Sequence, residues 1–107
     1  MGMDIYGMYP TAAAGVEFRA GFGSWAPIVN LIRELCDDLF TPEELHMLGY
    51  NEGAGPDDQA TCTEMANRFE GWLERNTNAP DSISKSDEAF IRRWMEFMRN
   101  CGGFRVC

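Results

Sequence analysis

FIRRWMEFMRNCGGFRVC, residues 90–107, joins a helical pattern to a strand pattern. Gly102-Gly103 is a typical helix stop, and the alternation of residues 104–107 after it predicts a short strand. We expect this strand to pair with a segment near the N-terminus. Before the glycines, apolar residues recur at helical spacing and are expected to face the core: Phe90, Ile91, Trp94, Met95, Met98 and Cys101.

Two short strands are expected in the N-terminal segment, residues 1–23, which is rich in glycine and aromatic residues and has no helical period. Their predicted positions are Met3 to Tyr6 and Val16 to Ala20. With the strand at 104–107 they would form one small sheet that joins the two ends of the chain.

An amphipathic helix is predicted from Trp25 onward, with Ser24 or Ala26 at its cap and Pro27 in its first turn. Thr41-Pro42-Glu43-Glu44 has the pattern of a capping box and predicts a short helix that ends at Leu48. The apolar stripe of the first helix consists of Ile28, Leu31, Ile32, Leu35, Cys36 and Leu39.

A third helix is predicted over residues 57–76, with Asp57 and Asp58 in its first turn. Residues 77–85 are expected to form a polar loop, after which Ser84 or Ser86 caps the fourth helix. The sequence thus predicts a mainly α (α+β) fold, a small domain with four helices and a short sheet. The stripe of the third helix consists of Cys62, Met65, Ala66, Phe69, Trp72 and Leu73.

The length of 107 residues is enough for one hydrophobic core, so a single domain over 1–107 is expected. No apolar run approaches the roughly 20 residues of a membrane span, and the N-terminus lacks a signal peptide, which predicts no membrane association and a cytoplasmic location. Its four cysteines include no Cys-x-x-Cys pair, which favours reduced core thiols over a metal site. We expect no metal and no cofactor.

The net charge of −8 is concentrated in the middle third of the chain, where residues 34–67 hold nine acidic and no basic residues. Such a charge disfavours direct nucleic-acid binding and favours a partner protein with a basic surface. Cation binding and a solvated face kept acidic for solubility remain the alternatives. The residues expected to form this acidic surface are Glu34, Asp37, Asp38, Glu43, Glu44, Asp57 and Asp58.

No catalytic motif is present. The single histidine, His46, lies beside Glu43 and Glu44, with no nucleophile suggested nearby. The turn at 51–56 lacks the lysine and hydroxyl of a P-loop and the acid spacing of an EF-hand, so a structural turn is favoured. Arg19 is expected to pair with an acid from this turn rather than to bind an anion.

Four segments, MGMDIYG (1–7), FRAGFGSWAPI (18–28), YNEGAG (50–55) and CGGFRVC (101–107), resemble a family of small bacterial and phage proteins that begin Met-Gly-Met-Asp-Val/Ile-Tyr-Gly. The resemblance implies a bacterial or phage origin and no particular activity. Ser24 and Ala26 depart from the family pattern, which has an aromatic residue and an arginine around the tryptophan. The matching positions that would converge on one pocket are Asp4, Tyr6, Arg19, Trp25, Asn51, Glu52, Gly53 and Gly55.

Our leading expectation is a small non-enzymatic binding protein, encoded by a phage or prophage, that inhibits a host defence complex. It would present its acidic surface to a basic host protein by nucleic-acid mimicry, in the host cytoplasm. The alternatives are a protein that binds or sequesters a small, nucleotide-type ligand in the pocket, and a small hydrolase. The sequence leaves the oligomeric state open.

Overall fold

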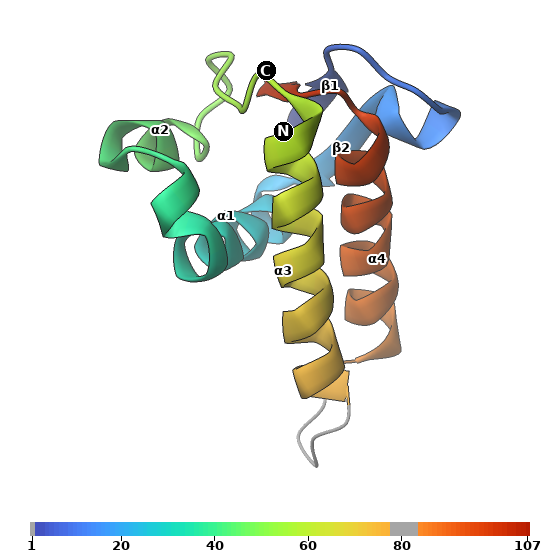
Figure 1. Ribbon diagram of the computed structural model, residues 1–107. Helices are drawn as coiled ribbons and strands as arrows, with labels where there is room; N and C mark the ends of the chain where they lie inside the picture. Colours follow the sequence, from blue (N-terminus) through green and yellow to red (C-terminus); the bar gives the residue numbers. More distant parts are fainter. Residues whose placement is uncertain (1, 78–83) are drawn as a thin grey trace.

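The computed structural model describes residues 2–77 and 84–107. Within these residues the predicted mainly α fold with four α-helices and a short sheet is confirmed (Figure 1). The elements follow in the order β1 (Gly2–Gly7), the 3-10 turn η1 (Ala13–Gly15), β2 (Glu17–Gly21), α1 (Phe22–Cys36), the 3-10 turn η2 (Asp37–Leu39), α2 (Pro42–Met47), α3 (Gln59–Thr77), α4 (Lys85–Asn100) and β3 (Phe104–Val106).

The sheet joins both ends of the chain, as predicted. β1 lies in the middle, with β2 antiparallel on one side and β3 antiparallel on the other. Ile5 stands opposite both Phe18 of β2 and Val106 of β3, and all three are buried. Since side chains alternate along a strand, the intervening residues face solvent. The outer side of β3 is covered by a bridge to Ala54.

The core lies between the sheet and the helices. Figure 1 shows α3 and α4 side by side, with the sheet at their upper ends and α1 crossing beside them. Trp94 of α4 is at the centre of an aromatic cluster: it stacks on Phe97 at 5.6 Å and meets the edges of Trp25 and Phe104 at 5.3 Å each. Such pairs stabilise a core beyond the area that they bury.

The start of α1 differs from the prediction. A cap at Ser24 or Ala26 was wrong, because β2 leads directly into the helix and Gly21, in extended conformation, is the N-cap. Pro27 therefore lies inside the helix rather than in its first turn. Because proline has no backbone N–H, the carbonyl of Gly23 lacks its usual helical hydrogen bond. α1 ends at Cys36, so the predicted stripe residue Leu39 belongs to η2.

The start of α3 is also corrected. Asp57 and Asp58 precede the helix rather than occupying its first turn. The Asp58 carboxylate accepts hydrogen bonds from the backbone N–H of Thr61, at 3.2 Å, and from its hydroxyl, at 2.8 Å. Asp58 thus caps the helix from outside, which satisfies a backbone donor that has no partner within the helix.

Two other predicted caps are confirmed. In α2, the Thr41 hydroxyl accepts from the Glu44 N–H at 3.1 Å, and the Glu44 carboxylate accepts from the Thr41 N–H at 2.8 Å. In α4, Ser84 rather than Ser86 is the cap, accepting from the Asp87 N–H at 3.1 Å. Of the loop predicted at 77–85, Thr77 ends α3 and Lys85 begins α4, while residues 78–83 lie outside the described residues.

The connection between β1 and β2 crosses the end of α4 backbone to backbone. Tyr9 N–H donates to the Cys101 carbonyl at 3.0 Å, and Thr11 N–H donates to the Asn100 carbonyl at 2.8 Å. These bonds satisfy carbonyls that the last turn of a helix leaves unpaired. The contact is close enough that a Cβ on Gly15 would lie 1.9 Å from the Asn100 oxygen.

In the part of the chain that the structure describes, no helix is both long enough and apolar enough to cross a bilayer. Cys36, Cys62 and Cys101 are buried with free thiols, and Cys107 is exposed and also free.

Candidate functional site

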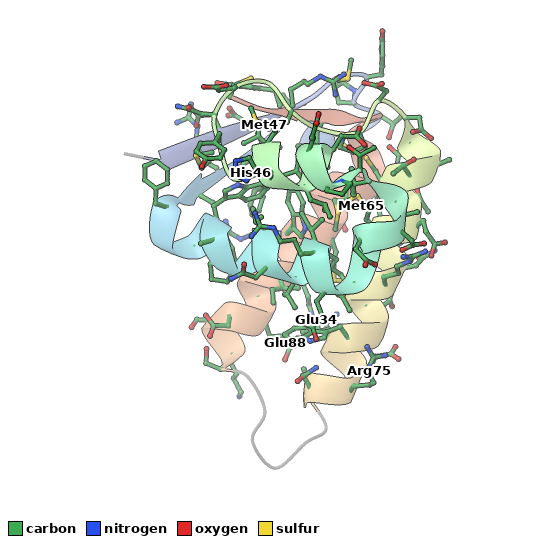
Figure 2. The ribbon with its side chains drawn as sticks, turned by 90° about the vertical axis from the view of Figure 1, so that its left-hand side faces the viewer. Glu34, His46, Met47, Met65, Arg75 and Glu88 are labelled. Carbon is green, nitrogen blue, oxygen red and sulfur yellow. The ribbon has the colours of Figure 1, made fainter. Side chains whose placement is uncertain are left out.

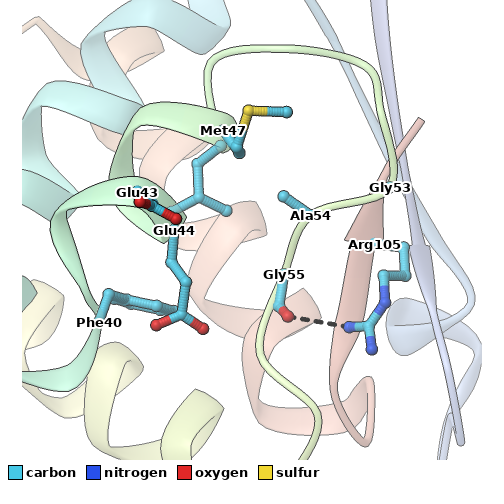
Figure 3. Close-up of a pocket in the computed structure, with 9 residues that line it drawn as sticks. Phe40, Glu43, Glu44, Met47, Gly53, Ala54, Gly55 and Arg105 are labelled. Atoms are coloured by element: carbon cyan, nitrogen blue, oxygen red, sulfur yellow. Dashed lines mark hydrogen bonds between the residues drawn. The ribbon is translucent and has the colours of Figure 1, made fainter.

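A groove lies between α2 and the segment that precedes α3 (Figure 3). It consists of two hollows of about 310 and 170 Å³ that share Phe40, Glu44 and Gly55. We call it the acidic groove. One wall is lined by Phe40, Glu43, Glu44 and Met47, and the other by residues 53–58 and Arg105.

The first wall is positioned by the capping box of α2. Because that box fixes the first turn, Glu43 and Glu44 stand together at the start of the helix. Phe40 and Met47 are half-buried and supply apolar surface to the same wall. The end of the helix is anchored in the core, where Trp25 Nε1 donates to the Leu48 carbonyl at 2.8 Å.

The second wall is held by hydrogen bonds to β3. Gly53 N–H donates to the Val106 carbonyl at 2.7 Å, and Val106 N–H donates to Ala54 at 2.8 Å. A Cβ on Gly55 would lie 1.9 Å from the Phe104 oxygen, so this close approach requires glycine. The glycine-rich turn is thus a structural turn that extends the edge of the sheet.

Arg105 ties the second wall together. Its guanidinium donates to the carbonyl of Gly55 at 2.9 Å (Figure 3). It also donates to the carbonyl of Pro56 at 3.2 Å and forms an ion pair with Asp57. Among the described residues that line the groove, Arg105 is the one basic side chain, and Asp57 balances its charge.

The remaining carboxylates leave the groove negative. Within the described residues, Glu43, Glu44 and Asp58 form no ion pair with a lysine or arginine. Glu44 and Asp58 accept backbone hydrogen bonds in their capping roles, and such bonds do not cancel a charge. The groove therefore combines an excess of negative charge with an apolar lining.

The rest of the predicted acidic surface lies outside the groove. Asp38 pairs with Arg68, whose guanidinium also contacts Glu64 at 2.9 Å. The hydrogen bond from Arg68 lowers the pKa of Asp38 below its ordinary value. Glu34 and Asp37 are exposed and have no basic partner in the described part of the chain. Figure 2 shows Glu34 well away from Met47 of the groove.

Three residues of the predicted pocket, Asp4, Tyr6 and Arg19, lie on the outer face of the sheet. Arg19 Nε is 3.4 Å from Asp4 and 3.6 Å from Glu17. The prediction that Arg19 pairs with an acid from the turn was wrong, because the register of β1 and β2 places Asp4 directly opposite it.

The other pocket residues lie elsewhere. Trp25 is 2% exposed and donates to Leu48 inside the core. Asn51 and Glu52 are exposed, whereas Gly53 and Gly55 line the acidic groove. The structure therefore does not bring these residues into one pocket with the outer face of the sheet.

The surroundings of His46 and of the buried cysteines are structural in the described part of the chain. The His46 ring packs on Tyr50 at 5.1 Å and forms no hydrogen bond to a described cysteine or serine. Burial raises the pKa of Cys36 to about 12. A hydrogen bond with Cys101, together with burial, raises the pKa of Cys62. Both thiols therefore stay protonated and are poor nucleophiles. Within residues 2–77 and 84–107, no group of three or more His, Cys, Asp or Glu side chains is placed to hold a metal ion.

Three groove residues were not predicted from the sequence to belong to a site: Phe40, Met47 and Arg105. The alternation of residues 104–107 already placed Arg105 on the face opposite Phe104 and Val106. Its partner could not be deduced, because that depends on the bridge between β3 and Ala54.

No known protein family, curated protein or solved structure matches this chain. The functional assignment therefore rests on the geometry and charge of the acidic groove.

Proposed function

We propose that this chain is a non-enzymatic binding protein whose acidic groove takes a basic segment of a partner protein. The observation that carries the proposal is the excess of carboxylates, led by the unpaired Glu43, beside the apolar surface of Phe40 and Met47. Lysine and arginine match this combination, because each has an apolar stem and a charged head. The stem would pack on the apolar wall while the head pairs with a carboxylate.

The field of the whole molecule favours the same class of partner. Acidic residues of the middle third carry the net charge of −8, and opposite charge accelerates the encounter of two proteins. The same field opposes nucleotide-type ligands, since Glu43, Glu44 and Asp58 would repel phosphate. A hydrolase would need a nucleophile and base within reach, which the surroundings of His46 do not supply.

The biological form that we propose is an inhibitor, encoded by a phage or prophage, of a host defence complex. A protein surface that holds nucleic acid is basic, so an acidic groove can occupy it in place of the phosphates. The resemblance of four segments to small bacterial and phage proteins is the reason for choosing this setting, and we propose the host cytoplasm as the location of the interaction.

The test uses a fluorescently labelled oligoarginine peptide as the probe, with fluorescence anisotropy as the measurement. Glu43→Gln should weaken binding by about fivefold, because it removes an unpaired carboxylate of the groove. Glu34→Gln makes the same chemical change on α1, outside the groove, and is the matched control.

Raising NaCl from about 50 to about 300 mM should weaken binding further, as expected for screened charges. Equal losses for the two variants would contradict the groove as the site. Absence of binding to the peptide at low salt would overturn the proposed function.

A further inference from the structure

β2 forms an open edge of the sheet. It pairs with β1 on one side, and within the described residues no segment pairs with its other side. The opposite edge differs, since β3 is covered by the hydrogen bonds of Gly53 and Ala54. An uncovered edge strand presents unpaired N–H and C=O groups that can pair with another chain.

The register identifies which groups point outward from β2. Asp4 exchanges backbone hydrogen bonds with Cys107 at 3.2 and 2.7 Å, so its polar backbone groups point toward β3 and away from β2. Arg19 stands opposite Asp4, and in an antiparallel ladder the backbone groups of such a pair point away from each other. The backbone N–H and C=O of Glu17, two residues earlier, point outward in the same direction.

The side chains of these two residues have opposite charges and are exposed, 45% for Glu17 and 70% for Arg19. Proteins often protect an edge strand with charged side chains that repel a second copy. Here the two charges are self-complementary instead. An antiparallel pair centred on Phe18 places Glu17 of each copy opposite Arg19 of the other.

The same register also satisfies the backbone. Glu17 and Arg19 carry the outward N–H and C=O groups, and an opposing pair of this kind exchanges two hydrogen bonds. Shifting the centre to Arg19 would place two arginines opposite each other, and centring on Glu17 would do the same with two glutamates. Like charges directly opposite are destabilising, so the register centred on Phe18 is selected.

Exposed apolar side chains lie at both ends of this edge. Val16 precedes β2 and is 51% exposed, and Phe22 follows it and is 50% exposed. In the antiparallel arrangement, Val16 of one copy approaches Ala20 of the other, near the start of α1. By symmetry, Val16 of each copy would thereby be covered.

We propose that this protein forms a homodimer in which β2 of one copy pairs antiparallel with β2 of a second, in the register centred on Phe18. The sheet then continues across both subunits, with an ion pair between Glu17 and Arg19 on each side of the twofold axis. The acidic groove lies beside β3, at the other edge of the sheet, so the dimer does not depend on the groove.

Charge reversal at the two positions tests this dimer by analytical ultracentrifugation. E17R and R19E each turn both ion pairs into like-charge pairs and should weaken dimerisation about tenfold or more. An equal mixture of the two variants restores both pairs and should form a heterodimer about as stable as the unmodified homodimer. In a register centred on Glu17 or Arg19, each single reversal would leave like charges opposite each other, as in the unmodified chain, so loss of dimer in both single variants together with recovery in the mixture identifies the register centred on Phe18.

E52R is the matched control, because Glu52 is exposed and lies away from β2; it should dimerise like the unmodified chain. Circular dichroism checks the fold of each variant. If a charge-reversal variant does not fold, E17Q and R19Q are used instead. Each of these neutral variants should weaken the dimer about threefold, because it removes the ion pairs without adding like charges. A monomer at roughly 100 μM, or variants whose mixture stays as weak as its parts, would overturn the proposal.

Discussion

At the scale of single residues, the tightest constraint is the crossing between the β1–β2 connection and the end of α4. A Cβ on Gly15 would lie 1.9 Å from the Asn100 oxygen, and a Cβ on Gly7 would lie 1.9 Å from the Gly15 oxygen. Three backbone segments are stacked at this place. Any side chain there must push apart a helix end and the sheet.

Gly15→Ala should therefore destabilise the protein by about 3 kcal/mol, since the obstacle is backbone and cannot rotate away. The measurement is the free energy of unfolding in urea. Gly23→Ala is the control: nothing lies within 4 Å of its Cβ, and inside α1 the change should stabilise by up to about 1 kcal/mol. Effects of the same sign for the two variants would contradict this explanation.

The sequence alone could not distinguish these two glycines. The first 23 residues are glycine-rich as a composition, but the contact with Asn100 joins residues 85 positions apart. The partner of Arg19 could not be predicted from the sequence either. Its surroundings along the chain did not identify Asp4 as its partner, because the register between β1 and β2 determines that pairing.

At the scale of elements, α2 is the least self-sufficient part of the fold. It has six residues, and helices of this length do not persist alone in water. The capping box holds its first turn, and the bond from Trp25 to the Leu48 carbonyl holds its end. The first wall of the acidic groove depends on these contacts.

Thr41→Ala should release α2 locally, because it removes the hydroxyl that accepts from the Glu44 N–H, a contribution of about 1 kcal/mol. Hydrogen exchange should then accelerate in residues 44–48 more than elsewhere. Ser84→Ala removes the equivalent cap from the long α4, where packing of the helix face should keep exchange slow beyond the first turn. Uniform acceleration in both variants would refute a local role for the Thr41 cap.

Element positions were largely predictable because each helix has an apolar face of helical spacing that packs in the core. The face predicted for α4 is buried at Ile91, Trp94, Met95 and Met98. Helix ends were predicted less well. α1 starts early because a strand runs straight into it, and no local cap residue signals that transition.

At the scale of the whole molecule, the fold partly corrects the uneven charge of the sequence. Arg68 pairs with Asp38 and Glu64, and Arg105 pairs with Asp57, so arginines of the last third neutralise acids of the middle third. The other acids of residues 34–67 have no basic partner among the described residues. Their mutual repulsion opposes folding.

Glu34→Gln should raise the melting temperature by about 2 °C at low salt, because it removes one of these repelling charges. Added NaCl should raise the melting temperature of the unmodified chain, and the variant should respond less. Glu96→Gln, on α4 among Arg92, Arg93 and Arg99, should not raise it. If both variants were stabilised alike, local charge could not be the cause.

The candidate site was predictable in its charge but not in its shape. Glu43, Glu44, Asp57 and Asp58 were identified as acidic surface residues and do line the groove. Its apolar wall and Arg105 were not identified, because the groove forms only where the turn at 53–56 joins β3. Contacts between such distant segments leave no periodic signal in the chain.

The placement of β3 between β1 and the segment 53–56 has a consequence for protein synthesis. A ribosome adds residues 104–106 after α1 to α4 have been made, yet Phe104 and Val106 are fully buried in the folded core. Until they leave the exit tunnel, β1 and the glycine-rich turn have no strand between them. Nascent chains stalled before residue 104 should remain sensitive to protease, and resistance should appear only once β3 has emerged.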